Sequence, residues 1–369
     1  MLDSNIVNIR NEVDNWLLSF NEAISDKNSK TVSIENLNKL FFENSHWRDI
    51  LALTWQIQTT SGKQNIIPKL YDKVLNVIAK DFVIDPQRTQ PREVIRAGKN
   101  VVEVILKFKT KFGYCEGVVR LYEDSEVSGT FKAWNFLTAL SDLNSSFNKK
   151  EDQYENTLEG PNWLDVRKED RLYKDRDPEV LVVGSGQAGL SIAARLKQQN
   201  IDTLVVDKNE RVGDNWRNRY HSLKLHNQTH VNHLPYMPFP PTWPTYIPKD
   251  KLAGWFEYYA ESMELNVWTK TTFISAEYDK TEKNWNVKLK LSDGNERIMK
   301  PKHIVMAVGV SSVPNRTKIP GMDGYKGKVI HSTDYSNGRD YKGKNVLVFG
   351  TGTSAHDVAQ DLYVHGANV

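Results

Sequence analysis

The sequence predicts an α/β fold made of two strand–turn–helix units, preceded by a separate α+β domain. The first observation is the stretch VLVVGSGQAGL, in which an apolar strand runs into a glycine-rich turn and a helix. The second is NVLVFGTGTSAHD, which repeats this pattern near the end of the chain. The third is an amino-terminal zone in which helical patterns precede strand patterns, as in α+β domains.

Residues 1–148 are predicted to form the α+β domain. Apolar residues recur at helical spacing in three segments, around Trp16 and Phe20, around Leu37, and over residues 65–80. The stretches VVEVILKFKT, GYCEGVVRLYE and SGTFKAWNFL are rich in β-branched and aromatic residues and predict an antiparallel meander. Three helices followed by three strands are therefore expected.

Residues 149–178 predict a solvated connector, because 16 of the 30 residues are charged and Gly160-Pro161 interrupts the segment. Residues 179–343 predict a Rossmann-type domain, with ERIMKPKHIVMAVG as its last strand. Residues 344–369 predict the start of a second Rossmann domain, with NVLVF as its strand. The chain stops where the next strand is expected, so this second domain is expected to be incomplete.

Composition excludes several classes of protein. With 49 Lys+Arg and 46 Asp+Glu the formal net charge is +3, which gives no electrostatic argument for nucleic acid. No apolar run approaches the roughly 18 residues of a membrane span, and the first residues lack the pattern of a secretory signal. Cys115 is the only cysteine, so disulfides and a CxxC redox pair are not expected. A cytoplasmic protein is expected.

The first glycine turn carries the signature of a dinucleotide site. Gly184 permits the tight turn, Gly186 lets the backbone approach a pyrophosphate, and Gly189 lets the helix pack on the strand. The helix N-terminus then presents N–H groups and a positive dipole to the phosphates. Asp207 ends the next strand, 18 residues past Gly189, where an acid can accept hydrogen bonds from a ribose.

The second glycine turn has Gly350, Gly352 and Ala355 at the three glycine positions. Alanine is an accepted variant at the third position. Two such turns, 166 residues apart, indicate two dinucleotides, of which one is a bound cofactor and the other its reductant. A glycine turn without ligand remains an alternative here, because the strand that would carry the ribose reader lies beyond Val369.

Three shorter motifs between the turns make a family visible. ERVGDNW resembles the GGxW segment of flavoprotein monooxygenases, AVG at residues 307–309 is similar to their ATG strand end, and YKGKVIHSTDY resembles the FxGxxxHxxx(F/Y/W) fingerprint. Over residues 178–369 the chain therefore resembles flavin-containing monooxygenases. Tyr335 at the end of the fingerprint resembles the branch that oxygenates nitrogen and sulfur more than the Baeyer–Villiger branch.

The resemblance implies a monooxygenase that uses FAD and NADPH. NADPH would reduce FAD, and the reduced flavin would capture O2 as a C4a-hydroperoxide, from which one oxygen atom passes to a small organic substrate. Such chemistry needs a site that excludes water. Two alternatives stay open at this point. One is a non-catalytic module that binds FAD or a protein partner, and the other is an NADPH-driven flavin reductase or oxidase that releases peroxide.

The resemblance also implies roles for individual residues. The FAD site would comprise the following residues: Gly184, Ser185, Gly186, Gln187, Ala188, Gly189, Asp207, Lys208, Asn215, Trp216 and Ala307. The NADPH phosphates would meet Gly350, Gly352, Thr353, Ser354 and Ala355. His331 would couple the two dinucleotide-binding domains. In the family an asparagine supports the oxygenated flavin. His226 stands at the matching place and Asn227 follows one residue later, so either is a candidate catalytic residue.

Two further features have competing interpretations. His221, His226, His230 and His233 fall within 13 residues, yet they lack the spacing and companions of a metal site, so no metal is predicted. The amino-terminal domain resembles a nuclear-transport-factor-2-like (NTF2-like) cone. A cone could bind substrate, mediate a homodimer or cover the FAD domain, and the last two interpretations are favoured.

Overall fold

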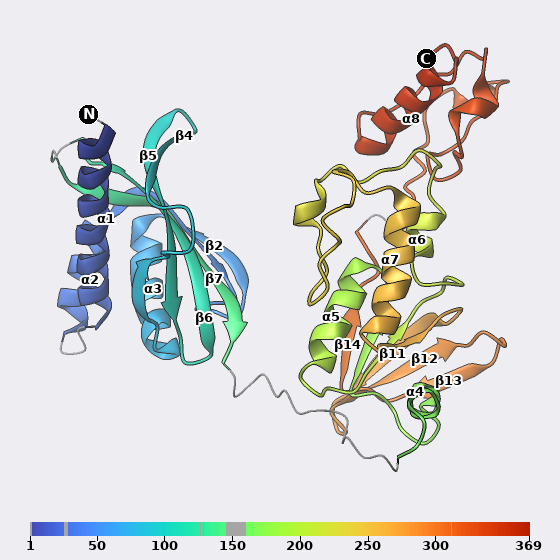
Figure 1. The fold of residues 1–369 in the computed structure, drawn as a ribbon, viewed down its shortest axis with the longest axis horizontal. Coiled ribbons are helices and arrows are strands. Elements are labelled where there is room, and N and C mark those ends of the chain that lie inside the picture. Colours follow the sequence, from blue (N-terminus) through green and yellow to red (C-terminus); the bar gives the residue numbers. More distant parts are fainter. Residues whose placement is uncertain (1, 26–28, 126, 128, 145–159, 311) are drawn as a thin grey trace. The chain divides into compact units, whose positions relative to one another are not determined.

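The computed structural model describes residues 2–25, 29–125, 127, 129–144, 160–310 and 312–369 (Figure 1). The chain divides into two compact units, residues 1–149 and 150–369. Each unit has its own hydrophobic core, and each is described by itself below.

The first unit packs three helices against a mostly antiparallel sheet. The helices are α1 (Leu2–Ser25), α2 (Lys30–Lys39) and α3 (Lys63–Val77). The strands are β1 (Phe41–Ile50), β2 (Ile57–Ser61), β3 (Lys80–Ile84), β4 (Arg92–Arg96), β5 (Lys99–Lys109), β6 (Gly113–Glu123) and β7 (Phe131–Leu143). The sheet order is β2-β1-β7-β6-β5-β3, with β4 paired to β5, and only β1 and β7 run parallel.

The predicted α+β class of this unit is confirmed, although its order is more mixed than expected. Strands β1 and β2 precede α3, so the helices do not all come first. The helical periodicity was the correct signal for the core, since Trp16 and Phe20 are buried and their rings stack at 5.1 Å. Phe136 of β7 meets the Phe20 ring edge-on, which joins helix and sheet. Likeness to an NTF2-like cone stays a prediction.

The second unit is built on a parallel sheet with the order β10-β9-β8-β14. Its strands are β8 (Val180–Val183), β9 (Thr203–Val206), β10 (Asn266–Trp268) and β14 (His303–Met306). Strands β8 and β9 are buried on both faces, which explains why their sequences VLVV and TLVV are continuously apolar. The helices α5 (Gln187–Lys197), α6 (Asp214–Arg217) and α7 (Lys249–Ser262) accompany this sheet (Figure 1). The predicted Rossmann-type α/β fold is thereby confirmed.

The strand expected over ERIMKPKHIVMAVG is divided between two sheets, so that expectation of a single strand was wrong. Strand β13 (Glu296–Met299) joins β11 (Thr272–Asp279) and β12 (Asn284–Lys290) in an antiparallel sheet, whereas β14 joins the parallel one. Pro301 lies between β13 and β14. Proline has no N–H for a ladder hydrogen bond, which favours a break in the strand there.

Part of the segment predicted as a solvated connector is folded onto the second unit. Helix α4 (Trp163–Leu172) lies within it, and Asn162 caps its first turn by accepting a hydrogen bond from Leu164 N. Arg167 is buried and donates to the carbonyl oxygen of Glu264, at 2.5 Å. The charge of this segment therefore reflects ion pairs and carbonyl contacts as well as solvent.

The strand expected before the second glycine turn does not form. Residues 346–349 have no ladder partner among the described residues, and only an isolated bridge joins Asn345 to Asn368. Leu347 and Phe349 are 88% and 77% exposed. The helix that follows, α8 (Thr353–Val364), does form as expected. An apolar strand sequence needs a neighbouring strand to satisfy its backbone groups.

Short 3-10 turns complete the second unit. They are η1 (Thr229–Val231), η2 (Met322–Gly324) and η3 (Gly338–Tyr341). Within the part of the chain that the structure describes, every helix is too short or too polar to cross a membrane.

Candidate dinucleotide sites

The first glycine turn lies where β8 ends and α5 begins, at the carboxyl edge of the parallel sheet. Gly184 has φ +106°, and a Cβ atom there would stand 2.5 Å from the carbonyl oxygen of Ala307. A Cβ atom on Gly189 would stand 1.8 Å from the carbonyl oxygen of Gly184. The structure thus brings three predicted residues together, and two of the glycines are required by packing inside the protein.

Gly186 differs from the other two glycines because the space beside it is nearly empty. An added Cβ would meet only the side-chain amide of Asn215, at 3.3 Å. Gly186 is also the N-cap residue of α5, and no side chain caps the N–H groups of the first turn. Gln187 and Ala188, which open the helix, have exposed side chains. This cradle fits a phosphate group that takes its hydrogen bonds from backbone N–H groups.

Asp207 follows β9 and holds the glycine turn in place. Its Oδ2 atom accepts hydrogen bonds from the N and Oγ atoms of Ser185, both at 2.7 Å, and its Oδ1 atom accepts one from Asn209 N at 2.9 Å. The residue is 9% exposed. A carboxylate can accept about four hydrogen bonds, so one position remains for a ribose hydroxyl. Lys208, the next residue, is exposed.

Asn215 and Trp216 lie on α6, beside the first glycine turn. The indole ring of Trp216 packs against two hydrophobic clusters of the second unit. Its Nε1 atom is buried, and none of the described residues accepts a hydrogen bond from it. A buried donor without a partner carries a free-energy cost of about 1–3 kcal/mol. A bound group with an acceptor atom would remove that cost, and this fits a cofactor along α6.

The second glycine turn is more open than the first. Gly350 has φ +139°, and an added Cβ atom there would lie 3.7 Å from the Cβ atom of Ala355, an ordinary contact. Gly352 is the N-cap residue of α8, and a Cβ atom on it would meet nothing within 4 Å. Thr353 is exposed and Ser354 is half-buried. The backbone here also fits a phosphate group, although its preceding strand is absent.

The two candidate catalytic residues, His226 and Asn227, make different contacts. The Nε2 atom of His226 lies 3.0 Å from the Oδ2 atom of Asp357, on α8. That Oδ2 atom also accepts a hydrogen bond of 2.6 Å from the Tyr220 hydroxyl. Asn227 is exposed, and its backbone oxygen accepts a hydrogen bond from Asn232. The structure thus connects His226, but not the Asn227 side chain, to the helix of the second glycine turn.

The hydrogen bonds of His331 stay within its own turn. Its Nδ1 atom accepts from Thr333 N at 3.2 Å and lies 2.9 Å from the hydroxyl of the same threonine. Tyr335, four residues later, makes the contact that reaches α8. Its hydroxyl donates to Asp361 of α8 at 2.6 Å, and burial together with this hydrogen bond raises the pKa of Tyr335.

Sequence reasoning missed Tyr220, Asp357 and Asp361 as site residues. The two acids are four residues apart on a predicted helix, which places them on one face, and this spacing was an available signal. Burial, followed by the hydrogen bond to Asp357, raises the pKa of Tyr220 to about 12. Tyr220 therefore contacts α8 through the Asp357 side chain.

A cavity of about 710 Å³ lies beside this junction. Its walls come from residues 221–226, from Tyr246 and Pro248, and from the α8 side chains Asp357, Gln360, Asp361 and Val364. His221 and His226 both line it. His233, from the same histidine cluster, accepts a hydrogen bond from Phe239 N. Among the described residues, no three His, Cys, Asp or Glu side chains are arranged to hold a metal ion.

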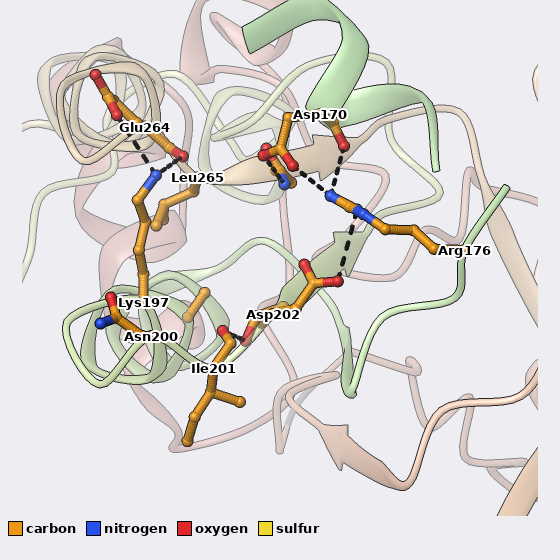
Figure 2. Close-up of a pocket in the computed structure, with 11 residues that line it drawn as sticks. Asp170, Arg176, Lys197, Asn200, Ile201, Asp202, Glu264 and Leu265 are labelled. Atoms are coloured by element: carbon orange, nitrogen blue, oxygen red, sulfur yellow. Dashed lines mark hydrogen bonds and ion pairs between the residues drawn. The ribbon is translucent and has the colours of Figure 1, made fainter. Parts of the chain in front are cut away.

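A second cavity, of about 450 Å³, lies at the opposite end of the parallel strands (Figure 2). It is lined by the first residues of β9 and β10 and by the end of α5. Figure 2 shows Arg176 between Asp170 and Asp202, and Lys197 beside Glu264. Lys197 donates to the Glu264 carbonyl at 2.7 Å. The charged groups of this cavity are paired with one another, and ligands of open α/β sheets bind at the other edge.

Comparison with known proteins follows the same division of the chain. Residues 181–369 match the profile of the family described as pyridine nucleotide-disulphide oxidoreductase. The chain is 35% identical over 193 residues to the probable indole-3-pyruvate monooxygenase YUCCA3 of Arabidopsis thaliana, covering 51% of this chain and 44% of that protein. It is 34% identical over 191 residues to the indole-3-pyruvate monooxygenase YUCCA1 of Oryza sativa subsp. japonica, covering 52% and 46%.

The chain therefore spans less than half of the length of these two relatives. Among solved structures, a flavin-containing monooxygenase from Stenotrophomonas maltophilia matches with a TM-score of 0.47 and 20% identity. That match covers 52% of this chain and 56% of the other.

Proposed function

Because the chain belongs to the pyridine nucleotide-disulphide oxidoreductase family, we propose that it acts as an FAD- and NADPH-dependent monooxygenase on a small organic substrate. The observation that carries the proposal is the cradle at Gly186, which is open where a pyrophosphate needs room and enclosed by packed glycines on either side. Relatives with monooxygenase names over the same residues support it.

In this proposal each glycine turn binds one of the two cofactors. Gly186 and the first turn of α5 bind the FAD pyrophosphate, Asp207 takes the adenine ribose, and Asn215 and Trp216 lie along the cofactor. Bound FAD supplies the redox chemistry and the activation of O2. The backbone at Gly350 and Gly352 binds NADPH phosphates. The chain's own residues orient these groups and exclude water from them.

We also propose the classes of substrate to be tested. The relatives named above are indole-3-pyruvate monooxygenases, so we propose an aromatic 2-oxo acid as the first substrate to test. Compounds with a nucleophilic nitrogen or sulfur atom come second, because the fingerprint motif resembles that branch. A dithiol route is disfavoured, since Cys115 is the only cysteine of this sequence and burial raises its pKa to about 12. A cytoplasmic location and a homodimer through the first unit stay predictions.

The first experiment is the visible absorbance spectrum of the purified chain with FAD, before and after anaerobic NADPH. A flavin spectrum that NADPH bleaches supports the proposal, and oxygenated product from a substrate panel then completes it. Oxygen consumption that yields only peroxide would replace it by an NADPH-driven flavin reductase or oxidase. A protein that takes up no FAD would leave this chain a non-catalytic interaction module.

A further inference from the structure

Asp357 joins two side chains that lie more than 130 positions away in the sequence. Its Oδ2 atom accepts a hydrogen bond from the Tyr220 hydroxyl at 2.6 Å and lies 3.0 Å from the Nε2 atom of His226. A carboxylate oxygen in this pair can only accept, so the Nε2 atom must carry a proton. In neutral His226 the other ring nitrogen, Nδ1, is then the acceptor.

The same helix carries the second glycine turn. Asp357 lies one helical turn after Thr353, the first residue of α8, and accepts the hydrogen bond of Tyr220 there. Tyr220 is 3% exposed, so its hydroxyl cannot exchange Asp357 for water without moving. A shift of the start of α8 would thus move Asp357 relative to both Tyr220 and His226.

Asp361 provides a second point of attachment for α8. Its Oδ2 atom accepts from the Tyr335 hydroxyl at 2.6 Å and from Gly338 N at 2.7 Å. Because Asp357 and Asp361 are one turn apart, α8 is attached at two successive points of one face. His226 is the outermost member of the network, with half of its side chain exposed. His226 and Asp357 both line the 710 Å³ cavity.

We propose that Asp357 is a positioning residue for His226, and that Tyr220 and Asp357 make the His226 ring respond to a dinucleotide bound at the second glycine turn. This inference rests on the proposed function for the identity of that dinucleotide. Asp357 fixes the tautomer and the orientation of the ring, as carboxylates do for histidines that serve in metal or catalytic sites. Tyr220 holds the same carboxylate through its hydroxyl.

The test uses the full 369-residue chain, labelled with ¹⁵N-histidine, and the ring signals of His226 in ¹H–¹⁵N correlation spectra. Loss of one set of signals in His226→Gln assigns the ring. The wild type is expected to show the tautomer with a proton on Nε2, and NADP⁺ is expected to shift these signals. In Asp357→Asn the neutral ring is expected to populate both tautomers, and the NADP⁺-induced shift is expected to disappear.

Two further variants separate positioning from general damage. Tyr220→Phe removes the hydrogen bond from Tyr220 to Asp357 but keeps the His226–Asp357 contact, so the tautomer should persist while the response to NADP⁺ is lost. Asp323→Asn removes an exposed carboxylate of η2 and should change neither readout. Thermal unfolding of each variant is measured alongside, and if Asp357→Asn fails to fold, Tyr220→Phe still decides the coupling.

The outcomes distinguish this inference from the proposed function. An unchanged His226 tautomer in folded Asp357→Asn would overturn the positioning role, whether or not NADP⁺ binds. Saturable NADP⁺ binding, seen by calorimetry, without a shift of the His226 signals in the wild type would overturn the coupling and leave the proposed function intact. Absence of NADP⁺ binding would overturn the coupling together with NADPH use, while the tautomer would still decide the positioning role.

Discussion

The backbone of Gly184 and the α-carbon of Gly189 are so close that a Cβ atom on Gly189 would stand 1.8 Å from the Gly184 carbonyl oxygen. Helix α5 can therefore pack against the end of β8 only with glycine at this position. Gly186 has no comparable neighbour, since its nearest contact is the flexible side chain of Asn215. Two glycines of the motif are thus required by packing, whereas the third leaves open space beside the backbone.

Substitution of the two kinds of glycine should separate stability from cofactor binding. Gly189→Ala is expected to destabilise the second unit by about 1–3 kcal/mol, because helix and strand must move apart. Gly186→Ala is expected to change stability by less than about 0.5 kcal/mol, yet to weaken FAD binding about tenfold by filling the cradle. Urea unfolding without FAD and flavin fluorescence titration measure the two effects. Equal FAD affinity in Gly186→Ala and wild type would contradict the proposal that the pyrophosphate of FAD binds beside Gly186.

Asp207 should support the fold even in the absence of cofactor. Asp207→Ala leaves the buried Ser185 N–H without its acceptor, and we expect a loss of about 1–3 kcal/mol in the free energy of unfolding. Ser185→Ala removes only the hydroxyl bond and should lose about 1 kcal/mol. Urea unfolding of both variants checks the order. A smaller effect in Asp207→Ala than in Ser185→Ala would refute the role of the carboxylate in holding the turn.

The sequence predicted those parts of the fold that have local signals. The runs at 180–183 and 203–206, the two glycine turns and the helices after them required only apolar pattern and glycine spacing. The resemblance to flavin-containing monooxygenases, carried by three motifs, is confirmed by the relatives with monooxygenase names. The break at Pro301 also had a local signal, but the apolar residues on both sides of it outweighed the proline in the pattern.

What could not be predicted depends on tertiary partners. Tyr220 and Asp357 are 137 positions apart, and neither residue type nor spacing indicates their hydrogen bond. The segment at 346–349 has a strand sequence but no partner strand among the described residues, so propensity alone does not make it a strand. Arg167 appeared as one charge in a charged segment, although its guanidinium is buried against backbone carbonyls.

Helix α4 should therefore stabilise the second unit. Arg167→Ala removes a donor from the carbonyl oxygens of Glu264 and Leu265, although Glu264 keeps its bond from Lys197, and it opens a gap under the helix. We expect a loss of about 2 kcal/mol in the free energy of unfolding. Lys168→Ala, on the exposed side of the same helix, is the matched control and should stay within about 0.5 kcal/mol. Equal effects of the two substitutions, measured in urea, would contradict a docked helix.

Tyr220 should make stability sensitive to alkaline pH. Its pKa is raised to about 12 in the folded protein, from about 10 in an unfolded chain. A raised pKa means that the folded protein favours the neutral phenol. The contribution of Tyr220 to the free energy of unfolding is therefore complete below pH 10 and is lost as the pH rises through about 12. Tyr335 has a raised pKa for the same reasons, burial and a carboxylate acceptor on α8, and adds in the same direction.

The free energy of unfolding of the wild type should thus fall steeply between pH 10 and 12, and that of Tyr220→Phe should fall less steeply. Tyr363→Phe is the matched control, since Tyr363 lies on α8 with an exposed side chain and its removal should leave the slope unchanged. Urea unfolding at a series of pH values gives the slopes. If wild type and Tyr220→Phe lose stability in parallel across this range, the Tyr220 hydroxyl is not held by Asp357 in solution. The proposed coupling between α8 and His226 would then lack the Tyr220–Asp357 hydrogen bond on which it depends.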